Sequence, residues 1–245
     1  MSNYIDFASF YDRLMSDCNY DARCEYILQL FDRFGNKPKL MLDLACGTGN
    51  FTYRMIEKGI DVIGVDMSAE MLNIAREKAD DATILPLFLC QKANELDLYG
   101  TVDSCICMLD SVNHITDYDE LCDSFKKVSL FMEKDGLFIF DVNTEYKHRC
   151  VLADNTFVTD DGELYTVWSN ECDGNMVNII LDFFVKDGEV YNRFTEEFSE
   201  RAYSDDELKN ALQSAGFEMV AIYGDISFSE PSDDEERKII VARKI

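Results

Sequence analysis

The sequence predicts an α/β fold built on a doubly wound, mostly parallel sheet, and three observations support this prediction. Between residues 40 and 142, strand-like segments alternate with segments of helical spacing. The strand-like segments (VIGVD, DSCICML, LFIFDV) are nearly continuous apolar runs, typical of parallel strands covered on both faces. A glycine-rich turn joins the first strand to the following helix. A ligand is therefore expected at the carboxyl ends of the strands, near the point where the strand order reverses.

The individual elements follow from periodicity and from start and stop signals. Two helices are expected first, Tyr4–Met15 and Ala22–Phe34, and Gly35-Asn36-Lys37-Pro38 ends the second. The expected strands are Leu40–Leu44, Asp61–Asp66, Thr83–Cys90, Val102–Met108 and Gly136–Val142, and the expected helices between them are Asn50–Lys58, Ala69–Ala79 and Tyr118–Met132. Ser204 with Glu207 forms a capping-box pattern, so a helix is expected from there to Gly216. Phe217–Tyr223 and Lys238–Lys244 are expected to close the sheet.

The pattern changes after residue 150. Three segments, Leu164–Cys172, Val177–Val185 and Val190–Ser199, alternate polar and apolar residues and are separated by Asp-Gly turns. This predicts a three-stranded antiparallel β insertion after the fifth strand. The expected organisation is an N-terminal helical cap (1–36), a ligand-binding core (37–150 and 201–245) and an antiparallel lid over the substrate (151–200). Six aromatic residues of the insertion are candidates for a substrate pocket, and about half should instead pack on the core: Tyr165, Trp168, Phe183, Phe184, Tyr191 and Phe194.

Composition limits the class of protein. The chain has 245 residues, is 47% hydrophobic and carries a net charge of -25, which disfavours nucleic acid and suits neutral or cationic substrates. It contains no apolar run long enough for a membrane span and no N-terminal pattern of a secretory signal. Nine cysteines without zinc-ligand spacing, and only two histidines, predict reduced thiols, a cytoplasmic location and no metal.

The turn Leu42–Asn50 (LDLACGTGN) carries the strongest functional signal. Gly47-Thr48-Gly49 offers bare backbone amides and a helix N-terminus to a ligand. A dinucleotide turn needs a third glycine where this chain has Thr52. Asp43 precedes the glycines and suits a cation better than phosphates. The turn thus favours S-adenosylmethionine (SAM), which carries an ammonium and a sulfonium, over NAD; a tight turn without a ligand is the remaining alternative.

Asp66, at the end of the second strand, is placed to accept both hydroxyls of a ribose. Ser68 is the better candidate for the cap of the following helix. Met67 and Met71 are candidates to flank an adenine, although a methionine at helical spacing is more often part of a core.

Three segments together resemble class I SAM-dependent methyltransferases: LDLACGTGN, VDMSAEML and DGLFIFDVNT. The chain resembles most closely a bacterial small-methyltransferase group with an N-terminal YD-x-L-M-x-D-x-x-Y signature, which here runs from Tyr11 to Tyr20. The resemblance implies a Rossmann-like fold. It also implies methyl transfer to a small-molecule acceptor by in-line displacement, with S-adenosylhomocysteine as the by-product.

The resemblance also implies residue roles. Gly47 and Gly49 are expected to face the methionine part of SAM, and Tyr11 or Tyr20 to close over the cofactor; packing of a helical cap is the alternative for the tyrosines. The loop that begins at Leu109 is expected to pass beside the sulfonium. The complete set of expected cofactor-binding residues is Tyr11, Tyr20, Asp43, Ala45, Gly47, Gly49, Asp66, Met67, Met71, Gln91 and Leu109.

Two departures from the family pattern bear on adenine binding and catalysis. Relatives often carry an acidic residue where this chain has Lys92, so Gln91 or a backbone group is expected to hold the adenine amine. Relatives commonly have a histidine where this chain has Phe198, which cannot move a proton. His114 is the candidate proton acceptor, with a plain loop role as the alternative. Asp141 or Asn143 is the candidate for orienting the substrate, with a capping or turn role as the alternative.

Two other functions stay open at this stage. One is an NAD-dependent oxidoreductase that uses the same turn. The other is a SAM-binding interaction module without turnover, which the departures at Lys92 and Phe198 motivate. The insertion is also a candidate contact for a homodimer.

Overall fold

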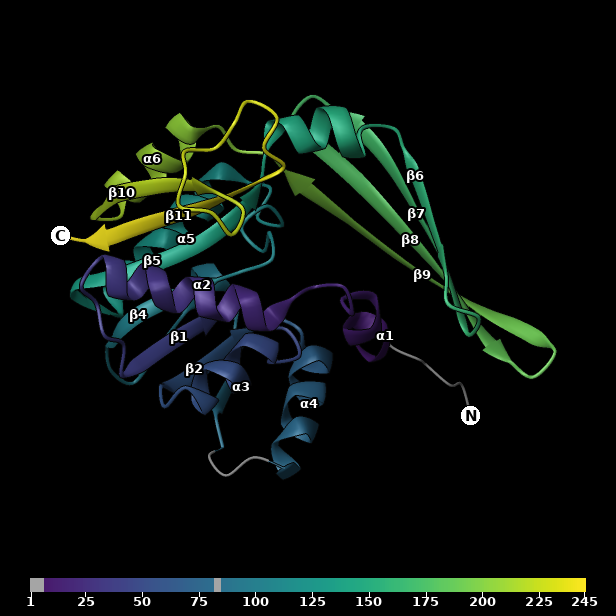
Figure 1. Cartoon of the computed structure of the whole chain (residues 1–245), viewed down its shortest axis with the longest axis horizontal. Helices are drawn as coiled ribbons and strands as arrows, with labels where there is room; N and C mark the ends of the chain where they lie inside the picture. The colour runs from purple at the N-terminus through teal and green to yellow at the C-terminus, as the bar shows by residue number, and fades with distance from the viewer. Residues whose placement is uncertain (1–6, 82–84) are drawn as a thin grey trace.

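The computed structural model describes residues 7–81 and 85–245 (Figure 1). Its central sheet has seven strands in the order β10-β11-β5-β4-β1-β2-β3. The strands are β1 (Leu40–Leu44), β2 (Asp61–Asp66), β3 (Leu87–Cys90), β4 (Val102–Cys107), β5 (Met132–Asn143), β10 (Phe217–Gly224) and β11 (Arg237–Lys244). β1 to β5 run parallel, and β11 is antiparallel to both of its neighbours. The predicted doubly wound, mostly parallel sheet is confirmed, and its strand order reverses between β1 and β4.

Helices cover both faces of this sheet. They are α2 (Tyr20–Arg33), α3 (Asn50–Glu57), α4 (Ala69–Glu77), α5 (Tyr118–Leu130) and α6 (Asp205–Ser214), with short 3-10 turns at Lys78–Asp81 and Ala93–Glu95. The coverage of both faces explains the apolar run in β5. Leu137 and Ile139 pack in the core under α2 and α3, whereas Phe138 and Phe140 pack in the core under α5 and α6. From Leu137 to Asn143, each side chain of β5 is therefore buried whichever way it points.

The chain segment between β5 and α6 forms a second sheet, which extends away from the core (Figure 1). It has four antiparallel strands in chain order: β6 (Thr156–Asp160), β7 (Leu164–Asp173), β8 (Met176–Asp187) and β9 (Val190–Arg201). The prediction of three strands was therefore wrong. All five residues of β6 are exposed, so this edge strand carries no burial pattern that the sequence could reveal. A π-helical turn, Lys147–Leu152, leads into the sheet.

Helix α1 (Phe7–Leu14) packs against the second sheet. Phe10 lies 6.2 Å from the ring centres of both Phe183 and Phe194. Of the six aromatic residues of the insertion, Phe183 is fully buried and Trp168 and Phe194 pack beside it, whereas Phe184 is half-buried and Tyr165 and Tyr191 are exposed. Three of the six thus pack in the core of the second sheet, and a substrate-pocket role for the others stays a prediction.

Some element boundaries differ from expectation. β5 begins at Met132 instead of Gly136, because Met132 pairs with Val102 before the register shifts. β3 begins at Leu87, after Pro86; residues 82–84, and the first three residues of the expected N-terminal helix, lie outside the described residues. The capping box at Ser204 is present as predicted. Among the described helices, none has the length and apolar character needed to cross a membrane.

Candidate active site

The glycine turn leaves β1 through left-handed backbone conformations. Ala45, Gly47 and Gly49 have φ values of 57°, 55° and 77°. A Cβ on Gly47 would meet nothing within 4 Å, so this side of the turn is open. A Cβ on Gly49 would lie 3.2 Å from Cζ of Phe88 and 3.3 Å from Cβ of Ala75. Gly47 therefore gives access to the backbone, and Gly49 permits close packing of α4 and β3.

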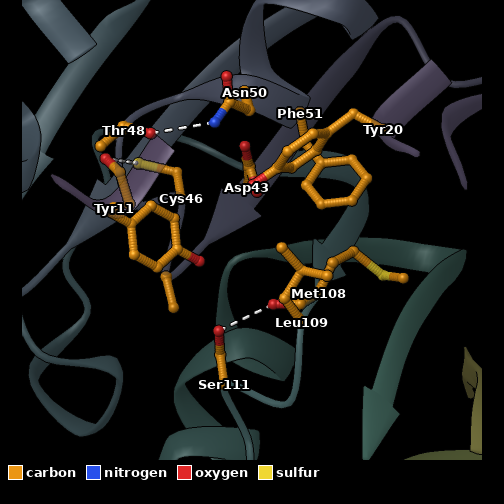
Figure 2. Close-up of a pocket in the computed structure, with 12 residues that line it drawn as sticks. Tyr11, Tyr20, Asp43, Cys46, Thr48, Asn50, Phe51, Met108, Leu109 and Ser111 are labelled. Carbon is orange, nitrogen blue, oxygen red and sulfur yellow. Dashed lines mark hydrogen bonds between the residues drawn. The ribbon is translucent and has the colours of Figure 1, made fainter. Parts of the chain in front are cut away.

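A cavity that is partly open to solvent lies where β1 and β4 end, at the reversal of strand order. Figure 2 shows Tyr11 on one side of it, Tyr20 and Phe51 on another, and Leu109 and Ser111 below them. Twelve residues line it: Tyr11, Tyr20, Asp43, Ala45, Cys46, Gly47, Thr48, Asn50, Phe51, Met108, Leu109 and Ser111. Parallel α/β sheets bind ligands at this position.

Six of the predicted cofactor residues come together here, and five do not line the cavity. Those that line it are Tyr11, Tyr20, Asp43, Ala45, Gly47 and Leu109; those that lie outside it are Gly49, Asp66, Met67, Met71 and Gln91. The residues that sequence reasoning missed lie within two positions of the predicted ones along the chain: Cys46, Thr48, Asn50, Phe51, Met108 and Ser111. Their position beside the two strand ends was the available signal.

Asp43 forms a buried acidic wall of the cavity. It is 1% exposed, and its Oδ2 accepts a hydrogen bond of 2.5 Å from Oγ1 of Thr52. Burial raises the pKa of Asp43 to about 7, and the nearby charge of Asp66 acts in the same direction. A cation in the cavity would favour the ionised form of this carboxyl group.

Asp66 joins the end of β2 to the glycine turn. Its Oδ2 accepts a hydrogen bond from the backbone N–H of Gly47, and its Oδ1 accepts one from Ser68, both of 2.8 Å. Burial raises the pKa of Asp66, although these backbone donors act against it. Ser68 caps α4 by accepting from Met71 N, as expected. The ribose contact of Asp66 stays a prediction.

The expected adenine residues lie beyond the cavity. Met67 is 67% exposed. The amide of Gln91 is engaged with backbone: Nε2 donates to Asp97 O at 3.2 Å, and Oε1 accepts from Asp97 N at 3.0 Å. These two bonds leave one N–H and one oxygen lone pair of the amide unused, and adenine binding by Gln91 stays a prediction.

Asp12 fixes α1 over the glycine turn. Its carboxylate accepts hydrogen bonds from Oγ1 of Thr48 (2.6 Å) and Nδ2 of Asn50 (2.8 Å), and it pairs with Nζ of Lys78 at 2.6 Å. This arrangement places the preceding Tyr11 in the cavity wall. The buried Tyr20 hydroxyl, from the start of α2, makes no hydrogen bond of good geometry within the described residues, and burial raises its pKa.

The loop after β4 is held in an unusual backbone conformation. Leu109 and Asp110 have φ values of 60° and 53°, in the left-handed region. Asp141 accepts from the Asp110 backbone N–H at 2.7 Å and pairs with Arg237 at 2.9 Å. Burial would raise the pKa of Asp110, but Arg237 and Lys147 lower it to about 2. Asp141 is 0% exposed, so in this arrangement it supports the loop and has no surface toward a substrate.

His114 lies at the junction of this loop with the second sheet. It is half exposed, its ring centre lies 5.0 Å from that of Phe198, and its Nε2 lies 4.0 Å from Oε1 of Glu200. Phe198, one of the two departures noted from the sequence, therefore packs against His114. Sequence reasoning missed Glu200, which the end of β9 brings to the loop.

Comparisons with known proteins agree with this geometry. The family described as "Methyltransferase domain" matches residues 41–136. The chain is 34% identical to a putative methyltransferase, YqeM, of Bacillus subtilis (strain 168) over 98% of this chain and 97% of the relative. It is 26% identical to a glycine/sarcosine N-methyltransferase of Aphanothece halophytica over 99% and 90% of the two chains.

A solved structure shows the same fold. A S-adenosylmethionine-dependent methyltransferase from Clostridium acetobutylicum ATCC 824 superposes with a TM-score of 0.90 and 34% identity over 99% of each chain. The fold and the crevice at the reversal of strand order define a class I methyltransferase. The chain belongs to the SAM-dependent methyltransferase family, and its cofactor is SAM. The NAD alternative has no support in these findings.

Proposed function

We propose that the protein transfers the methyl group of SAM to a small-molecule acceptor by in-line displacement. The observation that carries this proposal is the cavity at the ends of β1 and β4, which combines the open side of Gly47 with a buried carboxylate at Asp43. The glycine/sarcosine N-methyltransferase relative acts, by its name, on small molecules. When bound, SAM supplies an electrophilic methyl carbon. The protein's task is alignment, which contributes roughly 7–11 kcal/mol in well-oriented reactions.

The chemistry of the cavity fits the cofactor. Gly47 allows close approach to the backbone, Asp43 suits an ammonium, and the buried Tyr20 hydroxyl has a free hydrogen-bonding position. We propose that Tyr11, Tyr20, Asp43, Ala45, Gly47 and Leu109 surround the methionine and sulfonium part, with Gly49 supporting the turn. Asp66, Met67, Met71 and Gln91 are proposed to hold the adenosine part. Asp141 is proposed to position the loop that carries Asp110, and His114 to face the acceptor.

Calorimetric titration with SAM tests the cofactor assignment. Asp66→Asn is expected to weaken binding at least tenfold, about 1.4 kcal/mol, because it removes a charged acceptor from the ribose and from Gly47. Asp61→Asn, at the exposed opposite end of β2, is the matched control and should bind SAM normally. Unchanged affinity in the Asp66 variant would refute the ribose contact.

Turnover separates an enzyme from a binding module. Labelled SAM incubated with a metabolite extract is expected to give a labelled small molecule that depends on the protein. SAM binding without any labelled product would support the non-catalytic alternative.

We propose, further, that residues 1–36 form a cap, 37–150 and 201–245 the core, and 151–200 a lid. The free state of all nine cysteines supports a cytoplasmic location. Exposed apolar side chains of the insertion support a homodimer contact: Phe157, Val158, Val190 and Tyr191. Light scattering is expected to show a dimer in the full-length chain and a monomer after Val158→Lys.

A further inference from the structure

A polar cluster lies where the second sheet joins the core, with one exposed member and one buried member. Asp110, His114 and Glu200 each place one ligand-type atom within 4.8 Å of the others. Glu200 is 3% exposed, and its Oε2 accepts from Nδ2 of Asn143 at 2.9 Å. The cluster adjoins the cofactor cavity, because the chain neighbours of Asp110 on both sides, Leu109 and Ser111, line that cavity.

His148 gives this cluster an unsatisfied polar group. Its ring is 0% exposed, and neither ring nitrogen makes a hydrogen bond within the described chain. Nε2 of His148 lies 3.3 Å from Oε2 of Glu200. Nε2 therefore faces a carboxylate, whereas Nδ1 has no partner within the described chain. A buried polar atom without a partner costs free energy and indicates a place that a polar ligand completes.

The charges of the cluster select the kind of ligand. Asp110, Asp141 and Glu200 contribute three negative charges when ionised, and Arg237 and Lys147 contribute two positive ones. Negative charge is in excess when both histidines are neutral, since Glu236 also acts on Lys147. That excess suits a cation, and Asp110 is already paired with Arg237, so a metal ion would have to compete with Arg237 for this ligand.

We propose that this cluster is the acceptor subsite, and that the acceptor is a small primary or secondary amine which arrives as an ammonium ion. The inference rests on the proposed function and specifies its substrate class. Glu200 attracts the ammonium group, and Asp110 adds negative charge on the side of the cofactor cavity. The net charge of -25 favours the approach of cations over long range.

Methyl transfer at this subsite begins with deprotonation of the acceptor nitrogen. The ammonium ion gives one proton to His114, which frees the lone pair of the nitrogen. That lone pair forms the N–C bond to the methyl carbon while the C–S bond breaks and its electron pair stays on sulfur. The methylated nitrogen carries the positive charge and remains opposite Glu200. His114 is half exposed and passes its proton to water; the Phe198 ring supports the imidazole from β9.

The imidazole NMR signals provide a direct test, since the chain has only two histidines. The full-length protein, saturated with S-adenosylhomocysteine, is titrated with methylammonium, methanol or acetate at constant ionic strength. Methylammonium alone is expected to shift the His114 signals in a saturable way. Glu200→Gln, which preserves the shape and the acceptor for Asn143, should weaken this response at least tenfold. Glu197→Gln, which removes an exposed charge from the same strand, should leave it unchanged.

The outcomes separate the two proposals. Failure of the unmodified protein to bind S-adenosylhomocysteine in calorimetry would contradict the proposed function. Normal binding of that compound with no methylammonium-specific shift, or an equal shift with methanol, would overturn the amine subsite alone. A shift of both histidines by Mn²⁺ or Zn²⁺ that methylammonium cannot displace would also overturn it, and would assign the cluster to a metal.

Discussion

The two sheets of this protein bury their side chains in different ways. The seven-stranded sheet is covered by helices on both faces, so Leu137 and Phe138 are both fully buried although they point in opposite directions. The four-stranded sheet has a single packed face, centred on Phe183 and covered in part by Phe10 of α1. Its edge strand β6 is entirely exposed.

This difference indicates how each sheet contributes to function. The cofactor cavity is formed by strand ends that the core fixes through packing on two sides. The proposed acceptor subsite depends on Glu200, which the last residues of β9 bring to the core. We therefore expect the cofactor site to survive changes in the insertion, and the acceptor subsite to be sensitive to them.

The largest expected effect comes from truncating one buried phenylalanine in each sheet. Phe138→Ala should lower the free energy of unfolding by about 3–5 kcal/mol, because Phe125, Phe140 and Phe217 all contact this ring. Phe183→Ala should reduce global stability by less than half as much and raise amide exchange in the second sheet. Denaturant unfolding measures the loss of unfolding free energy in each variant, and hydrogen exchange measures the opening of the second sheet. Equal losses of free energy in the two variants would show that the two sheets unfold as one unit.

The two glycines of the turn should separate stability from cofactor affinity. Gly49→Ala is expected to cost about 2 kcal/mol of stability. The alanine must adopt a left-handed backbone conformation, and its Cβ must also fit against Phe88 and Ala75. Gly47→Ala should cost about 1 kcal/mol, since its Cβ meets no neighbour, but should lower SAM affinity more. Thermal unfolding and calorimetry measure the two quantities. A greater loss of stability in the Gly47 variant would contradict the assignment.

Asp43 should make cofactor binding depend on pH. Its folded pKa of about 7 lies above the unfolded value of about 3.9, so between these values folding takes up a proton and stability falls as pH rises toward 7. A bound cation favours ionisation, so SAM affinity should rise up to tenfold per pH unit below pH 7 and level off above it. Asp43→Asn should remove this dependence. Calorimetry in buffers of different ionisation enthalpy would detect the released proton, and a flat profile in the unmodified protein would argue against it.

The smallest effects concern the two polar links of α1. Asp12→Ala should cost about 1 kcal/mol and weaken SAM binding, since Asp12 holds Thr48, Asn50 and Lys78. Arg13→Ala breaks an exposed pair with Asp161 on the insertion and should leave both stability and SAM affinity nearly unchanged, because a solvent-exposed ion pair contributes little. If the Arg13 variant proved the more damaging one for SAM binding, the insertion would control the cofactor site after all.

Much of the core could be predicted because its signals are local. Apolar runs predicted the strands of the parallel sheet, and the Ser204–Glu207 spacing predicted the start of α6. β6 could not be predicted, since none of its side chains is buried and its five residues carry no periodic pattern. The shift of β5 to Met132 also depends on pairing with Val102, which sequence patterns do not encode.

By itself, the chain determined the glycine turn, the acid that precedes it and the acid at the end of the second strand. These depend on chain direction and backbone stereochemistry within a few residues. Only the tertiary structure decided that Tyr11 enters the cavity, that Asp141 is enclosed with Arg237, and that Glu200 meets His114 and His148. Such contacts join segments far apart in sequence, and their positions follow from packing of the whole fold, which no local pattern records.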